Sequence, residues 1–178
     1  MIFLSGNCLI NLYLGSQYEI YIYFLIIVSG LVQHIVHECG HMLTAKIFGE
    51  KIVKVQWFTY HGGTRVIYEN EPDDYNKNTA KKWAIIALGG YVATNILGYF
   101  LIFLYYTIPN NYLKLVCYIA SMMFLVTDCL YFTLGSIGNF GDIIGIRDIL
   151  NIPKSISVLL SIMVFSINIL IIKVVFYR

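Results

Sequence analysis

Long runs of apolar residues constrain this chain more than any other feature of its sequence. The first of them, Ile20–Val36, contains no Asp, Glu, Lys or Arg. An α-helix needs about 20 mostly apolar residues to cross the hydrocarbon core of a bilayer. Only 12% of the 178 residues are charged, whereas about 25% are charged in an ordinary soluble domain. The sequence therefore predicts an integral membrane protein.

We expect an all-α polytopic membrane protein, with all of residues 1–178 in one membrane-embedded domain. Residues 1–19 are an N-terminal apolar segment, too short for a crossing and interrupted by Asn7 and Asn11. We expect this segment to be interfacial or re-entrant. Four helices should cross the membrane, since each contains an apolar run of sufficient length. They are residues 20–47, 83–106, 114–136 and 156–176.

The longest polar stretch, residues 50–82, follows the first crossing. Ile52–Thr59 and Thr64–Tyr68 are rich in β-branched and aromatic residues, and His61-Gly62-Gly63 lies between them. Two such runs around a glycine-containing turn predict a β-hairpin. Glu71-Pro72-Asp73-Asp74 should then break the chain before the next helix.

The distribution of basic residues predicts the orientation in the membrane. Half of the 12 Lys and Arg residues lie in 50–82, which favours the cytoplasmic side for this loop. The end of the first crossing should then lie near the cytoplasmic face.

A net charge of +2 is too small to indicate a nucleic-acid partner. The four cysteines have no C-x-x-C spacing and predict no disulfide framework.

The first crossing carries the motif H-E-x-x-H near its end, at His37-Glu38-Cys39-Gly40-His41. Residues i and i+4 of a helix share one face, so His37 and His41 can reach the same metal ion. Glu38 is placed to act on a water bound to that metal. Because lone ionisable groups are costly within a membrane, this cluster indicates a functional site.

A catalytic zinc needs three protein ligands and one open position. Two further crossings return the chain to the same side of the membrane at Gly141-Asp142-Ile143-Ile144-Gly145. Topology therefore favours Asp142 as the third ligand, and the flanking glycines would allow close approach. Asp128, deeper in the third crossing, is the first alternative. Glu69 and Glu71 are the second, although Pro72 disfavours a helix there.

Three further polar residues have two interpretations each. His34 lies one turn before the motif, where it either supports the metal ligands or is itself a ligand. His61 is interpreted as a solvated turn residue rather than a ligand. Asn95 lies in the second crossing, after the glycine pair 89–90 that suits close helix packing. Its carboxamide either bonds a neighbouring helix or donates to a substrate oxyanion.

Taken together, these residues resemble the site-2 protease family of intramembrane metalloproteases, in particular its small, divergent members. The resemblance covers roughly 34–145. Its strong part is the motif followed by Thr44-Ala45-Lys46 and Gly49. A weaker match follows at Ala87-Leu88-Gly89-Gly90-Tyr91 with Asn95, and at Asn139-Phe140-Gly141-Asp142.

The resemblance implies a zinc metalloprotease that hydrolyses peptide bonds of membrane-spanning proteins within the lipid bilayer. Zinc would be held by His37, His41 and Asp142, with Glu38 as the base. Two other classes remain open. One is a catalytically inactive relative that acts as a membrane scaffold or binding subunit. The other is a small proton-coupled transporter component that uses Asp128, His34 and Glu38 as a relay.

Overall fold

The structure, a computed structural model, describes residues 19–57, 64–69 and 77–177. Within these residues the chain forms one long helix, then a β-hairpin, and then several further helices that pack with the first. In chain order they are α2 (Glu19–Ile47), β1 (Ile52–Gln56), β2 (Arg65–Tyr68), α3 (Lys77–Thr107), α4 (Asn111–Met122), the π-helical turn η2 (Met123–Thr127), α5 (Asp128–Gly138), α6 (Asp142–Leu150) and α7 (Lys154–Phe176).

The predicted membrane fold is confirmed. Among the described residues, four helical segments are long and apolar enough to cross a membrane: Glu19–Ile47, Thr79–Thr107, Asn111–Gly138 and Lys154–Phe176. The β-hairpin is confirmed as well, as a two-stranded antiparallel sheet. The N-terminal apolar segment, the turn at His61 and the break at residues 71–74 lie outside the described residues.

The helix bounds differ from the expected ones by more than three residues at two places. α3 begins at Lys77 rather than Trp83, because the polar residues before the apolar run continue the same helix. α6 is an additional helix, in a segment for which the sequence analysis predicted none. It is short, and its glycine at position 145 conceals the helical pattern.

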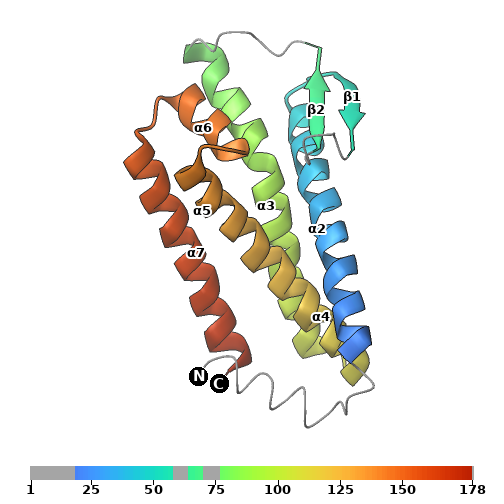
Figure 1. The fold of residues 1–178 in the computed structure, drawn as a ribbon. Helices are drawn as coiled ribbons and strands as arrows, with labels where there is room; N and C mark the ends of the chain where they lie inside the picture. Colours follow the sequence, from blue (N-terminus) through green and yellow to red (C-terminus); the bar gives the residue numbers. More distant parts are fainter. Residues whose placement is uncertain (1–18, 58–63, 70–76, 178) are drawn as a thin grey trace.

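Figure 1 shows α2 and α3 side by side, with the hairpin and α6 at the same end of the bundle. α7 runs from this end to the opposite one, where the described chain ends. Large apolar side chains cover the outside of the bundle, as Ile20, Ile96 and Leu159 illustrate with exposed fractions of 81%, 65% and 68%. Such a surface is suited to contact with lipid tails.

Small residues allow the backbones of α2 and α3 to approach closely. A Cβ added to Gly40 would lie 2.7 Å from Cβ of Ala93 and 2.8 Å from Cα of Gly90. Real side chains do not tolerate such distances, so a larger residue would push the helices apart. This is the packing role expected of small residues in lipid.

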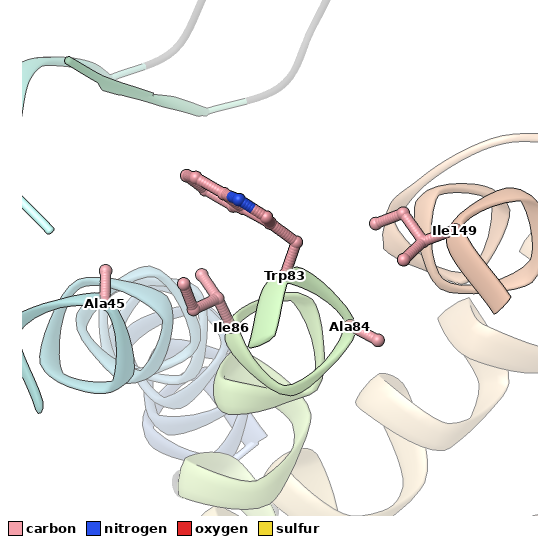
Figure 2. Packing of buried hydrophobic residues seen from close by; sticks show 5 residues of the cluster. All are labelled: Ala45, Trp83, Ala84, Ile86 and Ile149. Atoms are coloured by element: carbon pink, nitrogen blue, oxygen red, sulfur yellow. The ribbon is translucent and has the colours of Figure 1, made fainter. Parts of the chain in front are cut away.

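A cluster of buried apolar residues lies at the end of the bundle that carries α6. Figure 2 shows Trp83 of α3 extending over Ile86, with Ala45 of α2 on one side and Ile149 of α6 on the other. Ala84 completes the cluster. These contacts fix α6 against α3 and so determine where the first residue of α6 lies.

Both strands of the hairpin lie next to α2. Ile52 pairs with Tyr68 and Gln56 with Arg65, with a bulge at Val53. Nε2 of His34 in α2 lies 2.7 Å from the hydroxyl of Thr64, just before β2. Because His34 belongs to the first crossing, the hairpin lies alongside α2 at the level of the metal motif.

Candidate metal centre

The two histidines of the motif lie on one buried face of α2. His37 and His41 are 5% and 7% exposed, and the centroids of their rings are 4.8 Å apart. Nδ1 of His41 lies 2.8 Å from the carbonyl oxygen of Ile86 in α3. A carbonyl oxygen only accepts hydrogen bonds, so Nδ1 carries a proton, and Nε2 is the nitrogen that can offer a lone pair to a metal ion. A lone pair in this position is what a metal ion requires.

Asp142, the first residue of α6, brings a carboxylate to these imidazoles. Its Oδ2 lies 2.9 Å from Nε2 of His37 and 3.4 Å from Nε2 of His41. One atom from each of the three side chains lies within 4.8 Å of the other two. The fold therefore brings together the three residues that motif and topology predicted as metal ligands.

The charge state of Asp142 also suits a metal ligand. Burial on its own would raise the pKa of its carboxyl group. The hydrogen bonds and charges of His37 and His41 outweigh burial and hold this pKa well below its usual range. The carboxylate is therefore ionised at neutral pH, and a metal binds carboxylates in that form.

The turn between α5 and α6 explains how Asp142 comes so close. Asn139 and Gly141 both have positive φ angles, 57° and 75°, and they reverse the chain within a few residues. A Cβ on Gly141 would collide with the hydroxyl group of Tyr131. Glycine is therefore required at position 141 both for its φ angle and for space.

The missing side chain of Gly90 in α3 leaves room between the two imidazoles. A Cβ built on Gly90 would lie 2.6 Å from Nε2 of His41 and 2.7 Å from Nε2 of His37. The two ligand nitrogens thus converge on a space that any other residue at position 90 would fill. A cradle of this kind fits a bound ion better than it fits ordinary helix packing.

The set of donor atoms fits zinc. Two imidazole nitrogens and one carboxylate oxygen make up the three protein ligands of a catalytic site, with a fourth position open to water. Ligands of a tetrahedral zinc at 2.0–2.1 Å stand about 3.3 Å from one another. The distances of 2.9 and 3.4 Å from Asp142 to the imidazoles lie close to that value.

Glu38 lies beside this cluster. Its side chain is buried, with an exposed fraction of 7%, and its carboxyl group interacts electrostatically with His37, His41 and Asp142. It follows His37 directly in α2. A carboxylate so close to a metal position can accept a proton from water there.

Comparison with known families gives one match. The family model described as Peptidase M50B-like matches residues 8–175. The chain belongs to this family. It is the site-2 protease family that the motifs resemble, so the resemblance is confirmed. Curated proteins and solved structures gave no match.

In this family of membrane zinc metalloproteases, the position of Asp128 is informative. Asp128 begins α5 and lies on the other side of His37 from Asp142. Its Oδ1 is 2.9 Å from Nδ1 of His37 and 3.1 Å from Nε2 of Gln33, which donates to it. Oδ2 accepts from the hydroxyl of Thr94. Asp128 is not part of the group with metal-ligand spacing found among the described residues.

Asn95 bonds neighbouring helices. Its Nδ2 donates to the carbonyl oxygen of Tyr91 at 2.8 Å, and its Oδ1 accepts from Asn168 of α7 at 2.8 Å. Asn168 also contacts the sulfur of Cys129 at 2.9 Å. These contacts favour the interhelical interpretation of Asn95 over the oxyanion one.

The other candidate ligands have different partners. His34 contacts Thr64 of the hairpin, which suits a supporting residue rather than a ligand. Glu69 forms an exposed ion pair with Lys51, with 3.0 Å between Oε1 and Nζ. Glu71 and His61 lie outside the described residues.

Three residues near the cluster were missed by sequence reasoning. Gln33 and Thr94 contact Asp128, and Tyr131 lies edge-on to His37 with 6.3 Å between ring centroids. Of these three, only Gln33 could have been recognised from the sequence, because it is a polar residue in a mostly apolar run, one turn before His37. Thr94 and Tyr131 are ordinary in membrane helices and give no such signal.

Proposed function

We propose that this protein is an intramembrane zinc metalloprotease that hydrolyses peptide bonds of membrane-spanning proteins. The observation that carries the proposal is the convergence of His37, His41 and Asp142 on one space within the bundle, beside the buried carboxyl group of Glu38. Membership of the M50B-like family supports it. Ionisable groups are costly in lipid, and a bound metal accounts for all four.

In the proposed mechanism, His37, His41 and Asp142 would hold the zinc. Bound zinc would supply a positive charge for the substrate carbonyl and lower the pKa of its water to about 7. The carboxylate of Glu38 takes a proton from the attacking water and later gives it to the leaving amine. The buried position of Glu38 keeps that proton from exchanging with bulk water.

The substrate must be unwound before it can be cleaved, because helical hydrogen bonds occupy its backbone carbonyl groups. An edge of the hairpin offers free backbone groups and can hold an extended peptide by strand addition. The contact between His34 and Thr64 supports this proposal, since it fixes the hairpin next to the motif.

Proline at position 53 tests strand addition. Val53 is 60% exposed and has no partner in the β2 register, so its replacement disturbs the hairpin least. We expect Val53→Pro to lower turnover about two- to tenfold, since one net hydrogen bond contributes about 0.5–1.5 kcal/mol. Zinc content should not change. Val53→Ala is the control, and equal turnover in the two variants would rule out strand addition along β1.

We also propose that the metal centre lies nearer the cytoplasmic face. The stretch 50–82 that follows α2 carries half of the 12 Lys and Arg residues, and basic loops remain in the cytoplasm. The metal motif lies near the end of α2 that leads into this stretch.

Removal of the metal tests the proposed function itself. Purified wild-type protein should contain about one zinc per chain and cleave members of a panel of single-span proteins. Chelation should abolish cleavage, and added zinc should restore it, because the metal supplies the charge that the reaction needs. His41→Ala should lose both zinc and cleavage. If wild-type protein prepared in zinc-containing buffer holds no zinc, an inactive scaffold is favoured. If the protein conducts ions in liposomes and a chelator does not stop this flux, a transporter is favoured.

A further inference from the structure

Asp128 is a charged group in the middle of a membrane helix that the proposed reaction does not use. Its side chain is among the most deeply buried of the polar ones, with 2% exposed. A carboxylate in such a place needs several donors. Gln33 of α2 and Thr94 of α3 donate hydrogen bonds to it, and Nδ1 of His37, also in α2, lies 2.9 Å from its Oδ1. Two neighbouring helices therefore supply partners for one carboxylate of α5.

We propose that Asp128 is a positioning residue for the metal centre, an inference that rests on the proposed function. It keeps the proton of the His37 imidazole on Nδ1 and fixes the plane of the ring. Nε2 is then the nitrogen available to a metal ion, and it lies on the side of Asp142, 2.9 Å from Oδ2. Histidine ligands of metals commonly donate their other ring nitrogen to a carboxylate in this way.

The geometry explains why Asp128 is a support and Asp142 a ligand. The two carboxylates approach opposite nitrogens of the same ring, Nδ1 for Asp128 and Nε2 for Asp142. One imidazole cannot direct both nitrogens at one ion. Gln33 and Thr94 occupy lone pairs of Asp128 that a ligand would need for the metal.

The π-helical turn η2 sets the direction in which Asp128 points. It ends at Thr127, directly before Asp128, and π turns in helices are frequent at functional sites. One residue more or fewer in a helix rotates all later side chains by about 100°. Nδ2 of Asn168 lies 3.2 Å from the carbonyl oxygen of Leu125 within η2 and satisfies a group of this irregular turn.

The two ligand histidines are held by different means. The ring of His41 is fixed by a backbone carbonyl, that of Ile86, whereas His37 relies on the side chain of Asp128. A side-chain substitution can therefore release His37 while it leaves His41 in position. This difference makes the inference testable by mutation.

The test is the affinity of purified protein for zinc, measured by competition with a chelator of known affinity. Asp128→Asn preserves the shape of the side chain, but its amide can donate to Nδ1 and move the proton to Nε2. We expect the Kd for zinc to rise about 10–100-fold, the usual effect of losing such a partner. The thermal unfolding midpoint of the zinc-free protein should stay close to that of wild type, which a merely structural role would not predict.

Cys129→Ala is the matched control. Cys129 is the next residue in α5 and is equally buried, at 1% exposed, but it faces Tyr91 and Asn168 rather than His37. It should bind zinc as wild type does. An unchanged Kd in Asp128→Asn, or an equal loss in Cys129→Ala, overturns the inference.

A second variant covers the case in which Asp128→Asn does not fold. Thr94→Val removes one donor to the carboxylate and keeps the charge, and it should raise the Kd for zinc a few-fold. A Kd equal to that of wild type overturns the inference. The proposed function is tested separately by His41→Ala. If that variant loses zinc while Asp128→Asn keeps it, the metal centre stands and only the role of Asp128 is wrong.

Discussion

Glu38→Gln is expected to abolish cleavage of membrane-spanning substrates while the protein still binds zinc. Glutamine has nearly the same shape as glutamate but cannot accept a proton from water at neutral pH. General-base catalysis contributes about 10²–10⁴-fold to the rate, and we expect a loss of this size. Zinc content should remain that of wild type, because the three candidate ligands are other residues. Both quantities are measured on the same purified sample.

Cys39→Ser is the matched control for this experiment. Cys39 is the next residue in the motif, yet it is exposed and points away from the face that carries His37 and His41. Its replacement should change neither the rate nor the zinc content. A Glu38→Gln variant that cleaves at the wild-type rate would show that another group takes the proton. One that loses zinc would show that Glu38 helps to hold the metal.

Much of the fold could be predicted because lipid imposes simple rules. The bounds of α2 were predicted nearly to the residue, since a run without charges must be a crossing and the motif follows it on the same helix. The proximity of Asp142 to His37 could be predicted as well, because an even number of later crossings returns the chain to the same side. These inferences need only the order of helices and not their side-chain directions.

The role of each polar side chain could not be predicted, because it depends on the direction in which the side chain points from its helix. Whether Asp128 approaches Nε2 or Nδ1 of His37 is decided by rotation of α5, and the π-helical turn η2 changes that rotation. The partner of Asn95 is Asn168, 73 residues later in α7. Pairing of these two helices has no signal in a single sequence, so the sequence favoured the interhelical interpretation without identifying the partner of Asn95.

The glycines around the metal centre show the same limit. Gly89 and Gly90 both indicate close packing when only the sequence is known. In the structure Gly89 faces Thr44 and the backbone of α2, whereas Gly90 faces the imidazoles of His37 and His41. One glycine of the pair therefore serves helix packing and the other leaves space for the metal. Adjacent helix positions point about 100° apart, which accounts for the difference.

Gly90→Ala is expected to remove zinc binding with little loss of helical structure. The added Cβ would lie 2.6 Å from Nε2 of His41 and 2.7 Å from Nε2 of His37, so both rings must turn away from Asp142. Loss of a supporting contact alone costs 10–100-fold in metal affinity. Displacement of two ligands at once should raise the Kd for zinc about a hundredfold or more. Chelator competition measures the Kd, and circular dichroism reports the helix content.

Gly98→Ala separates this effect from a general opening of the bundle. Gly98 lies in the same helix, two turns after Gly90, and its added Cβ would meet the side chain of Leu125 at 2.7 Å rather than an imidazole. Overpacking there should lower the free energy of unfolding by about 1–3 kcal/mol and change the Kd for zinc far less than Gly90→Ala does. If both variants lost zinc equally, separation of the helices would explain the loss. If Gly90→Ala bound zinc as tightly as wild type, the metal could not lie between His37 and His41, and the ligand set would have to be reassigned.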